Sequence, residues 1–264
     1  MINEDKGWKI DLGMLDEKVA LITGGGQGVG QGIAFALAKE GAAVAILGRT
    51  EARLVETCGA IEGFGGHAIY MVCDVSDADA IEASVARTIE QLGGVDILIN
   101  NANDGGPGTI LDTSPEEFQR RFDIGPMATF RFMKACYPSM KARGGGSIIN
   151  MASSAAKRWD GSDYGVYAAA KEAIRSLSRS AACEWGVDRI RVNIVAPHAL
   201  STSLKEWVDS RPEEAEAFFQ TIPLGRIGDC EQDIGRGVVA LVSDNMSYLT
   251  GATIPLDGGQ AFWG

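Results

Sequence analysis

Short apolar runs rich in β-branched residues alternate with helical stretches along nearly the whole chain, and this alternation restricts the fold more than any other feature. Each run is short enough to be a buried strand, and the stretches between them carry apolar residues at helical spacing, such as Ile33 and Leu37. Strands that are apolar along their whole length belong to parallel sheets covered by helices on both faces. We therefore predict an α/β fold, a single doubly wound domain with a seven-stranded parallel sheet. The predicted strands are residues 19–23, 43–47, 68–75, 95–100, 147–151, 191–196 and 253–257, and the predicted helices include 30–40, 51–61, 78–92, 116–141, 164–184 and 231–243.

One domain is expected to span residues 1–264, because the chain contains no linker, internal repeat or low-complexity tract. Residues 1–17 are expected to be an N-terminal extension. The longest interruption, residues 198–222, follows the sixth strand and contains Leu204, Trp207 and Phe218. Ligands of open α/β sheets bind outside the carboxyl ends of the strands, so we predict that this segment is a substrate lid. A surface helical insertion with core aromatics fits the same pattern.

Charge and residue usage exclude several classes of function. A formal net charge of −11 and a pI near 4.7 disfavour nucleic acid and anionic membranes as partners, so the expected partner is a small molecule. The 5 cysteines lack CxxC or zinc spacing and are expected to be buried thiols in a reducing cytoplasm. The chain shows neither a signal peptide nor an apolar run of membrane length. With only 2 histidines, a His-rich metal site or a serine-hydrolase triad is hard to assemble, and we predict no metal.

A glycine-rich loop, Thr23-Gly24-Gly25-Gly26-Gln27-Gly28-Val29-Gly30, follows the first strand. Its pattern TGxxxGxG lets the backbone turn tightly and approach a pyrophosphate at the N-terminus of the next helix. A plain strand-to-helix turn would explain the glycines alone, but the position after the first strand of a βαβ unit favours dinucleotide binding. The loop thus predicts a Rossmann-type domain with cofactor contacts from Gly24, Gln27, Gly28, Val29 and Gly30.

The end of the second strand, Leu47-Gly48-Arg49-Thr50, bears on the choice of cofactor. An acidic residue here would hold the ribose 2′-hydroxyl of NAD, and none is present. Gly48 leaves room, and Arg49 offers a planar, charged group suited to a 2′-phosphate. We therefore predict NADP rather than NAD, while a solvated surface arginine is the alternative interpretation of Arg49.

Tyr167 and Lys171 are four residues apart in a predicted helix, which places them on the same face one turn apart. A nearby ammonium can bring a phenol, whose pKa is ordinarily about 10, toward proton exchange near neutral pH. Such pairs are common on exposed helices. Ser154, however, stands thirteen positions before Tyr167 at the end of the fifth strand and adds a hydroxyl at the same rim of the sheet. We predict Ser154, Tyr167 and Lys171 as catalytic residues.

These motifs resemble those of the short-chain dehydrogenase/reductase family, in order and spacing, from about Lys18 to Gly259. Further matching motifs are Asp74-Val75 after the third strand, Asn100-Asn101-Ala102 after the fourth, and Asp257-Gly258-Gly259 near the end. The resemblance implies that Asp74 and Val75 contact the adenine of the cofactor. It also implies that Asn100 and Ala102 flank the adenosine ribose and that Asn101 contacts the cofactor.

The resemblance further assigns roles in catalysis. Tyr167 would be the acid/base, Lys171 would hold the nicotinamide ribose and lower the pKa of Tyr167, and Ser154 would orient the substrate oxygen. Pro197 would also contact the cofactor. Thr202 keeps the position that resembles the family's contact to the nicotinamide carboxamide or a phosphate.

Three positions depart from the family pattern. Asn103 replaces the glycine of the motif NNAG, Gly125 replaces the asparagine of the central helix, and His198 replaces the glycine that usually follows the proline after the sixth strand. In the family that asparagine helps to hold a water linking the lysine to solvent, largely through its backbone carbonyl, which a glycine retains. His198 is expected near the nicotinamide, either touching substrate or as a tolerated residue at the rim.

The leading interpretation is an NADP-dependent alcohol dehydrogenase or ketoreductase. An enoyl- or dienoyl-CoA reductase is the second, in which Lys157 and Arg158 would attract a phosphorylated substrate. A non-catalytic dinucleotide-binding protein is the third. The resemblance also implies a homotetramer that pairs through the helices 116–141 and 164–184 and through the C-terminal strand near Asp257.

Overall fold

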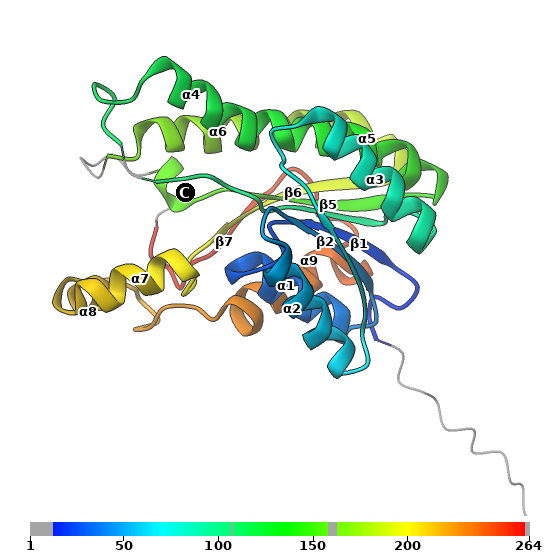
Figure 1. Cartoon of the computed structure of the whole chain (residues 1–264), viewed down its shortest axis with the longest axis horizontal. Helices are drawn as coiled ribbons and strands as arrows, with labels where there is room; N and C mark the ends of the chain where they lie inside the picture. The colour runs from blue at the N-terminus through cyan, green and yellow to red at the C-terminus, as the bar shows by residue number, and fades with distance from the viewer. Residues whose placement is uncertain (1–12, 107, 158–162, 262–264) are drawn as a thin grey trace, which may run out of the picture.

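The seven predicted strands form one parallel sheet in the computed structural model, which describes residues 13–106, 108–157 and 163–261 (Figure 1). Their spatial order is β3-β2-β1-β4-β5-β6-β7, and all neighbouring pairs run parallel. The predicted doubly wound α/β fold is thereby confirmed. The strands are β1 (Val19–Thr23), β2 (Ala43–Gly48), β3 (His67–Val72), β4 (Ile97–Asn100), β5 (Gly146–Met151), β6 (Ile190–Pro197) and β7 (Thr253–Leu256).

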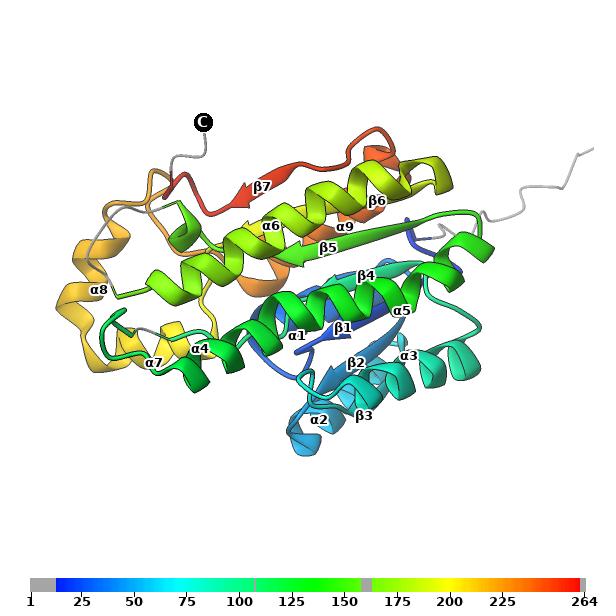
Figure 2. The ribbon, with the colours of Figure 1, turned by 90° about the horizontal axis from the view of Figure 1, so that it is seen from above.

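Helices cover both faces of this sheet (Figures 1 and 2). One face carries α1 (Gly28–Lys39), α2 (Glu51–Gly63) and α9 (Arg236–Val242), and the other carries α3 (Ala78–Leu92), α4 (Pro115–Phe122), α5 (Ala128–Ala142) and α6 (Gly165–Trp185). Each layer buries its own apolar cluster, which includes Ile33 and Leu37 on the first face and Phe132 on the second. Burial of apolar area, at about 25 cal/mol per Å², holds the two layers onto the sheet.

The strand order reverses between β1 and β4, and this reversal locates the expected ligand site. Ala20 of β1 pairs with Val44 on one side and with Ile97 on the other. In doubly wound sheets the crevice outside the carboxyl ends of the strands at such a reversal binds the ligand. The chain that leaves β1 at Thr23 and β4 at Asn100 therefore frames the site.

The helix predicted at 116–141 is two helices, α4 and α5, separated by a wider π-helical turn, Asp123–Met127. Pro126 lies inside this turn and has no N–H to continue the ordinary helical hydrogen-bond ladder. The helix predicted at 231–243 likewise begins as a π-helical turn, Cys230–Gly235, ahead of α9. That turn packs closely on α1, since a Cβ on Gly32 would lie 2.3 Å from the Cys230 carbonyl carbon.

Two segments at the margins of the sheet differ from simple expectation. Leu15, within the predicted N-terminal extension, is only 1% exposed and belongs to the core cluster of α1, whereas residues 1–12 lie outside the described residues. The predicted lid consists of α7 (Thr202–Ser210) and α8 (Pro212–Phe219).

Cys183 is exposed, contrary to the expectation that all the thiols are buried. Among the described residues, no helix is both long enough and apolar enough to cross a bilayer.

Candidate active site

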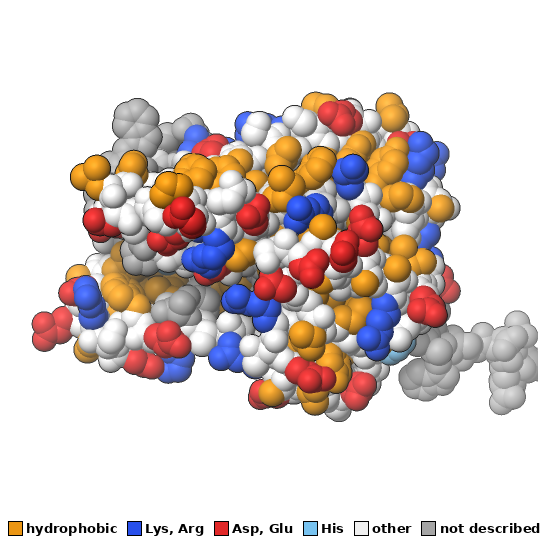
Figure 3. Space-filling model, turned by 45° about the horizontal axis from the view of Figure 1, so that its top comes forward, with side chains coloured by type: hydrophobic (Ala, Val, Ile, Leu, Met, Phe, Trp, Pro, Cys, Tyr) orange, Lys and Arg blue, Asp and Glu red, His pale blue; other side chains and the backbone are white. Residues whose placement is uncertain are grey.

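A pocket of about 1070 Å³ opens at the carboxyl ends of the strands. Figure 3 shows it as a hollow between the part of the molecule that carries α7 and α8 and the part that carries α4, with hydrophobic side chains visible inside. Of the predicted site residues, Gly30 and Asn100 do not line it. Those that do are Gly24, Gln27, Gly28, Val29, Arg49, Asp74, Val75, Asn101, Ala102, Ser154, Tyr167, Lys171, Pro197 and Thr202.

The glycine loop between β1 and α1 is held in a tight turn, with positive φ angles of 67° at Gly24 and 56° at Gly28. Side chains are strained in this region of backbone conformation, so glycine is required there. Gly30 is needed for close approach, because a Cβ on it would lie 2.3 Å from the Gly24 carbonyl oxygen. The loop leads directly into the N-terminus of α1, where free backbone N–H groups favour an anion.

Hydrogen bonds join this loop to the chain that leaves β4. The Thr23 hydroxyl accepts from the backbone N–H groups of Asn101 and Ala102, each at 2.9 Å, and the Asn101 amide donates to the Thr23 carbonyl at 3.0 Å. Asn100 does not line the pocket. Its amide instead donates to Asn150 of β5 at 2.8 Å inside the core.

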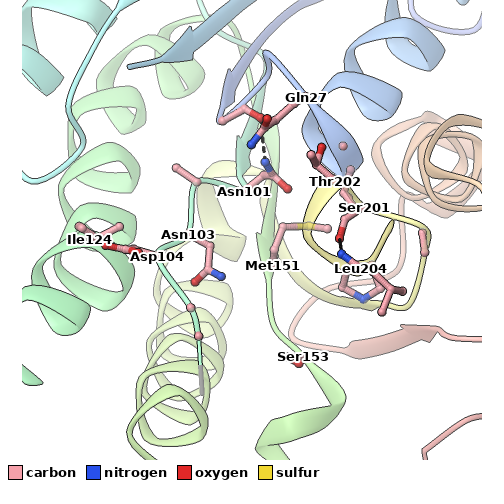
Figure 4. Close-up of a pocket in the computed structure, with 18 of the residues that line it drawn as sticks. Gln27, Asn101, Asn103, Asp104, Ile124, Met151, Ser153, Ser201, Thr202 and Leu204 are labelled. Carbon is pink, nitrogen blue, oxygen red and sulfur yellow. Dashed lines mark hydrogen bonds between the residues drawn. The ribbon is translucent and has the colours of Figure 1, made fainter. Parts of the chain in front are cut away.

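The lid comes close to the same loop at the start of α7. A Cβ on Gly28 would lie 3.6 Å from the Ser201 Cβ, and Ser201 caps α7 by accepting from the backbone N–H of Leu204 at 3.3 Å. Gln27, Asn101 and Thr202 lie together at this end of the pocket in Figure 4. A pyrophosphate on the glycine loop would therefore meet the N-terminal ends of both α1 and α7.

Two arginines line the pocket together with Asp74 and Val75. Arg49, at the end of β2, lies near enough to Asp74 to help lower the pKa of that carboxyl, although the hydrogen bonds from Ser76 contribute more. Arg53, one turn along in α2, also lines the pocket and donates to the side-chain oxygen of Gln27. Arg53 was not predicted, because it lies on α2, away from both the glycine loop and the residues directly after β2.

Tyr167 and Lys171 lie one turn apart on α6 and face the pocket. Lys171 is 4% exposed, its ammonium donates to the Met151 carbonyl at 2.8 Å, and it lies 5.5 Å from the centre of the Tyr167 ring. Burial lowers the pKa of Lys171 to about 8. Burial raises the pKa of Tyr167 above its ordinary value, while hydrogen bonds from Ser153 and Asn103 oppose that rise. The lowering of this pKa by Lys171 stays a prediction.

Ser153 is the serine that acts to lower the pKa of the Tyr167 phenol, whereas Ser154 was the predicted residue. Both serines line the pocket, and Ser154 begins a short 3-10 turn, Ser154–Ala156. The side chains of successive residues in an extended segment point in opposite directions. Only one of two neighbouring serines can therefore face the phenol. Counting back from Tyr167 cannot show that register. The role of Ser154 stays a prediction, and Ser153 becomes a second candidate.

The three positions that depart from the family pattern lie at different depths. Asn103 lines the pocket and bonds Tyr167. Gly125 lies in the π-helical turn, where a Cβ would make ordinary contact with Ala170 at 3.8 Å. His198 lines the pocket and meets Phe218 of the lid edge-to-face, with ring centres 5.4 Å apart.

The far end of the pocket is apolar and aromatic. Leu204 and Trp207 of α7 and Phe218 of α8 line it, and the Trp207 and Phe218 rings pack edge-to-face with centres 5.8 Å apart. Through His198 this aromatic pair also contacts the end of β6. The predicted lid thus contributes aromatic and aliphatic side chains to the pocket lining, together with Glu206.

Comparison with known proteins agrees with this arrangement. Residues 24–261 match the family model described as enoyl-(acyl carrier protein) reductase. The chain is 40% identical over 260 residues to 12α-hydroxysteroid dehydrogenase of Clostridium sp., covering 94% of this chain and 98% of that protein. It is 36% identical over 243 residues to 2,5-dichloro-2,5-cyclohexadiene-1,4-diol dehydrogenase of Sphingobium indicum, covering 92% of this chain and 95% of that one.

A solved structure is similar over nearly the whole length. It is 7α-hydroxysteroid dehydrogenase complexed with NADH and 7-oxo glycochenodeoxycholic acid, with a TM-score of 0.89, 32% identity, and coverage of 99% of this chain and 98% of that one. Fold and comparisons together define an oxidoreductase with a doubly wound dinucleotide-type domain. The chain belongs to the short-chain dehydrogenase/reductase family.

Replacing Lys171 by Met is expected to raise the free energy of unfolding at neutral pH. The folded-state pKa of Lys171, about 8, lies below the ordinary 10.5, because burial destabilises the charged ammonium. At neutral pH this destabilisation lowers the free energy of unfolding. That pKa shift corresponds to about 3 kcal/mol of stability that Lys171→Met would restore. Loss of the hydrogen bond to the Met151 carbonyl offsets about 1 kcal/mol of this gain. Because the cost fades as the pH rises from about 8 to 10.5, urea unfolding should show the gain at pH 7 shrinking toward pH 10.

Lys205→Met, at an exposed lysine of α7, is the matched control and should shift stability little at either pH. A Lys171→Met protein that is no more stable than the wild type at pH 7 would contradict the burial argument.

Proposed function

We propose that the protein is an NADP(H)-dependent oxidoreductase that interconverts a ketone and a secondary alcohol on a bulky alicyclic substrate. The observation that carries this proposal is the half-buried Tyr167 phenol, placed one turn from Lys171 in a pocket that Ser153 and the aromatic side chains of α7 and α8 also line. At neutral pH the raised pKa keeps this phenol protonated, as a proton donor for ketone reduction must be.

The residues present fit a nicotinamide dinucleotide. The glycine loop turns tightly through positive φ angles at Gly24 and Gly28 and lines the pocket ahead of α1. Arg49 and Arg53 also line it and would pair with a 2′-phosphate. Asp74 and Val75 line the pocket beside them. When bound, the dinucleotide supplies or accepts the hydride.

The chain's own residues would manage the proton and the orientation of substrate. Tyr167 gives its proton to the carbonyl oxygen in reduction and takes it back in oxidation. Ser153 or Ser154 donates a hydrogen bond to the same oxygen and so orients it. Lys171, held by the Met151 carbonyl, presents its ammonium toward the ribose hydroxyls and the phenol. The aromatic wall of α7 and α8 excludes water from the reacting atoms.

The substrate class follows from the apolar wall together with the relatives. Two relatives are named for hydroxysteroid chemistry and a third for a cyclic diol. We infer a rigid ring system that carries a secondary hydroxyl. The description of the matching family model keeps an enoyl thioester as the second candidate. Screening hydroxysteroids, cyclic alcohols and enoyl thioesters with NADPH and NADH side by side separates these classes.

Tyr167→Phe is expected to lower kcat by about 10²–10⁴-fold while leaving NADPH binding nearly intact, because only the transferable proton is removed. Ser153→Ala and Ser154→Ala form a matched pair of neighbouring truncations. The hydrogen bond to Tyr167 predicts that Ser153→Ala has the larger loss of kcat. A larger loss in Ser154→Ala would restore the first assignment, and a Tyr167→Phe enzyme with most of its activity would reject the proposed mechanism and favour a packed, non-catalytic tyrosine.

Arg49→Ala is expected to weaken NADPH binding by about 1.5–3 kcal/mol and to leave NADH little changed, because a charge-assisted contact is lost only with the 2′-phosphate. Arg53→Ala should act in the same direction. Dissociation constants for both cofactors are the measurement, with Arg179→Ala on the exposed side of α6 as a control for net charge. Equal losses for NADPH and NADH, or a wild type that prefers NADH, would reject the assignment.

We also propose that the chain forms a homotetramer through α4, α5 and α6. Met133 and Ile174 pack inside the subunit, whereas Met127 and Phe130 remain 41% exposed on the outer side of the same helices. Sedimentation at micromolar concentration should give about four times the chain mass of 27.9 kDa, and Phe130→Glu should shift the assembly to smaller species. A wild type that sediments as a monomer would exclude this assembly.

A further inference from the structure

Asn103 occupies an unusual place in the pocket, beside the proposed proton donor. It follows Ala102 on the chain that leaves β4, and its side chain points into the pocket (Figure 4). Ser153 reaches the same pocket from the chain after β5. Both side chains act to lower the pKa of the Tyr167 phenol, and the Asn103 amide nitrogen and the Tyr167 ring edge both lie next to Gly105. Polar side chains from two different loops therefore approach the phenol.

Contacts on both sides of Asn103 hold its loop in place. Before it, the Asn101 and Ala102 backbone is bonded to the Thr23 hydroxyl at 2.9 Å. After it, Asp104 forms an ion pair with Arg120 of α4. A loop anchored at both ends lets a short side chain keep one direction, which a positioning role requires.

A second arginine of α4 fixes the end of the same loop. Arg121 is only 7% exposed, and its guanidinium donates to the Gly106 carbonyl at 2.7 Å. It also donates to Glu117, at 2.6 Å, so its own direction is set. The segment from Asn101 to Gly106 is thus hydrogen-bonded to the end of β1 at its start and to α4 at its end.

Packing against the ring explains why a glycine follows. A Cβ on Gly105 would lie 2.3 Å from Cε2 of Tyr167 and 2.7 Å from the Asn103 amide nitrogen. Any side chain at this position would displace either the ring or the amide. Gly105 therefore allows the loop to lie flat on the ring while Asn103 reaches the phenol oxygen.

We propose that Asn103 is a positioning residue for Tyr167: its amide N–H holds the phenol oxygen beside Ser153 and stabilises the negative charge that this oxygen gains during reduction. In that step the O–H bond of Tyr167 breaks, a new O–H bond forms on the substrate oxygen, and the phenolate is later reprotonated from solvent. The proposal rests on the function proposed for Tyr167. A hydrogen bond to an ionised oxygen is worth about twice a neutral one, so the contact strengthens as the proton leaves.

Other charged or titratable groups near the phenol are few and can be separated from Asn103. Lys171 lies one turn along α6, and Tyr164 lies on the same helix with its ring 5.8 Å from that of Tyr167. Asp104 is engaged by Arg120. None of these is changed by substitution at Asn103, so a shift in the titration of Tyr167 reports the amide itself.

The test compares Asn103→Gly, which removes the amide, with Asn103→Asp, which keeps the shape but replaces the donor by a negative charge. For oxidation of a 12α-hydroxysteroid such as deoxycholate, kcat rises with pH as Tyr167 becomes able to accept a proton. The midpoint should move up by about one pH unit in Asn103→Gly and further in Asn103→Asp. Asp104→Asn, which weakens the loop anchor but keeps the Asn103 amide, should move the midpoint by less than Asn103→Gly does.

A readout that needs no turnover accompanies the profile. In protein labelled with ¹³C at tyrosine Cζ, the Tyr167 signal is identified by its loss in Tyr167→Phe. This signal should shift in both Asn103 variants and shift less in Asp104→Asn. Midpoints and Cζ shifts that match the wild type would overturn the proposal. An active Tyr167→Phe enzyme would instead reject the proposed function, while the Cζ signal would still show whether Asn103 bonds the phenol.

Discussion

One threonine hydroxyl joins the two halves of the site, and the arrangement of the pocket depends on it. Thr23 ends β1, at the point where the strand order reverses, and its oxygen accepts two backbone N–H groups from the chain that leaves β4. The glycine loop, which suits a pyrophosphate, and the loop of Asn103, which reaches Tyr167, are thereby fixed to each other. A parallel sheet brings all carboxyl ends to one edge, and this small cluster of hydrogen bonds keeps the loops there in register.

Burial shifts the pKa values of both Tyr167 and Lys171, in opposite directions. Removal from water raises the pKa of the phenol and lowers that of the ammonium, so each is pushed toward its neutral form. The family-based expectation emphasised only the attraction of phenolate by the lysine. In the structure the opposing contributions come from hydroxyl and amide donors, Ser153 and Asn103, which favour the charged phenol without adding a charge of their own.

Periodicity and turn chemistry made much of this molecule predictable. The seven strands, the TGxxxGxG loop and the pair Tyr167 and Lys171 depend on local pattern, and pattern is visible in a sequence. Three features depend on contacts between distant segments. Which serine meets the phenol depends on how the chain turns after β5. Arg53 joins the cofactor end of the pocket because α2 folds back over the glycine loop, and the break between α4 and α5 is a π-helical turn that the apolar spacing of the helix did not reveal.

The segment that forms α7 and α8 contributes little to the hydrophobic core. Among its described side chains Ala215 alone is buried, whereas Leu204, Trp207 and Phe218 face the pocket. Substitutions in this segment therefore change the shape of the cavity while the stability of the sheet is nearly preserved. Such a division lets new specificities arise through a few mutations without first eroding the fold, since stability is what most limits the acceptance of new side chains. The scaffold is thus readily evolvable in the segment that we propose to recognise the substrate.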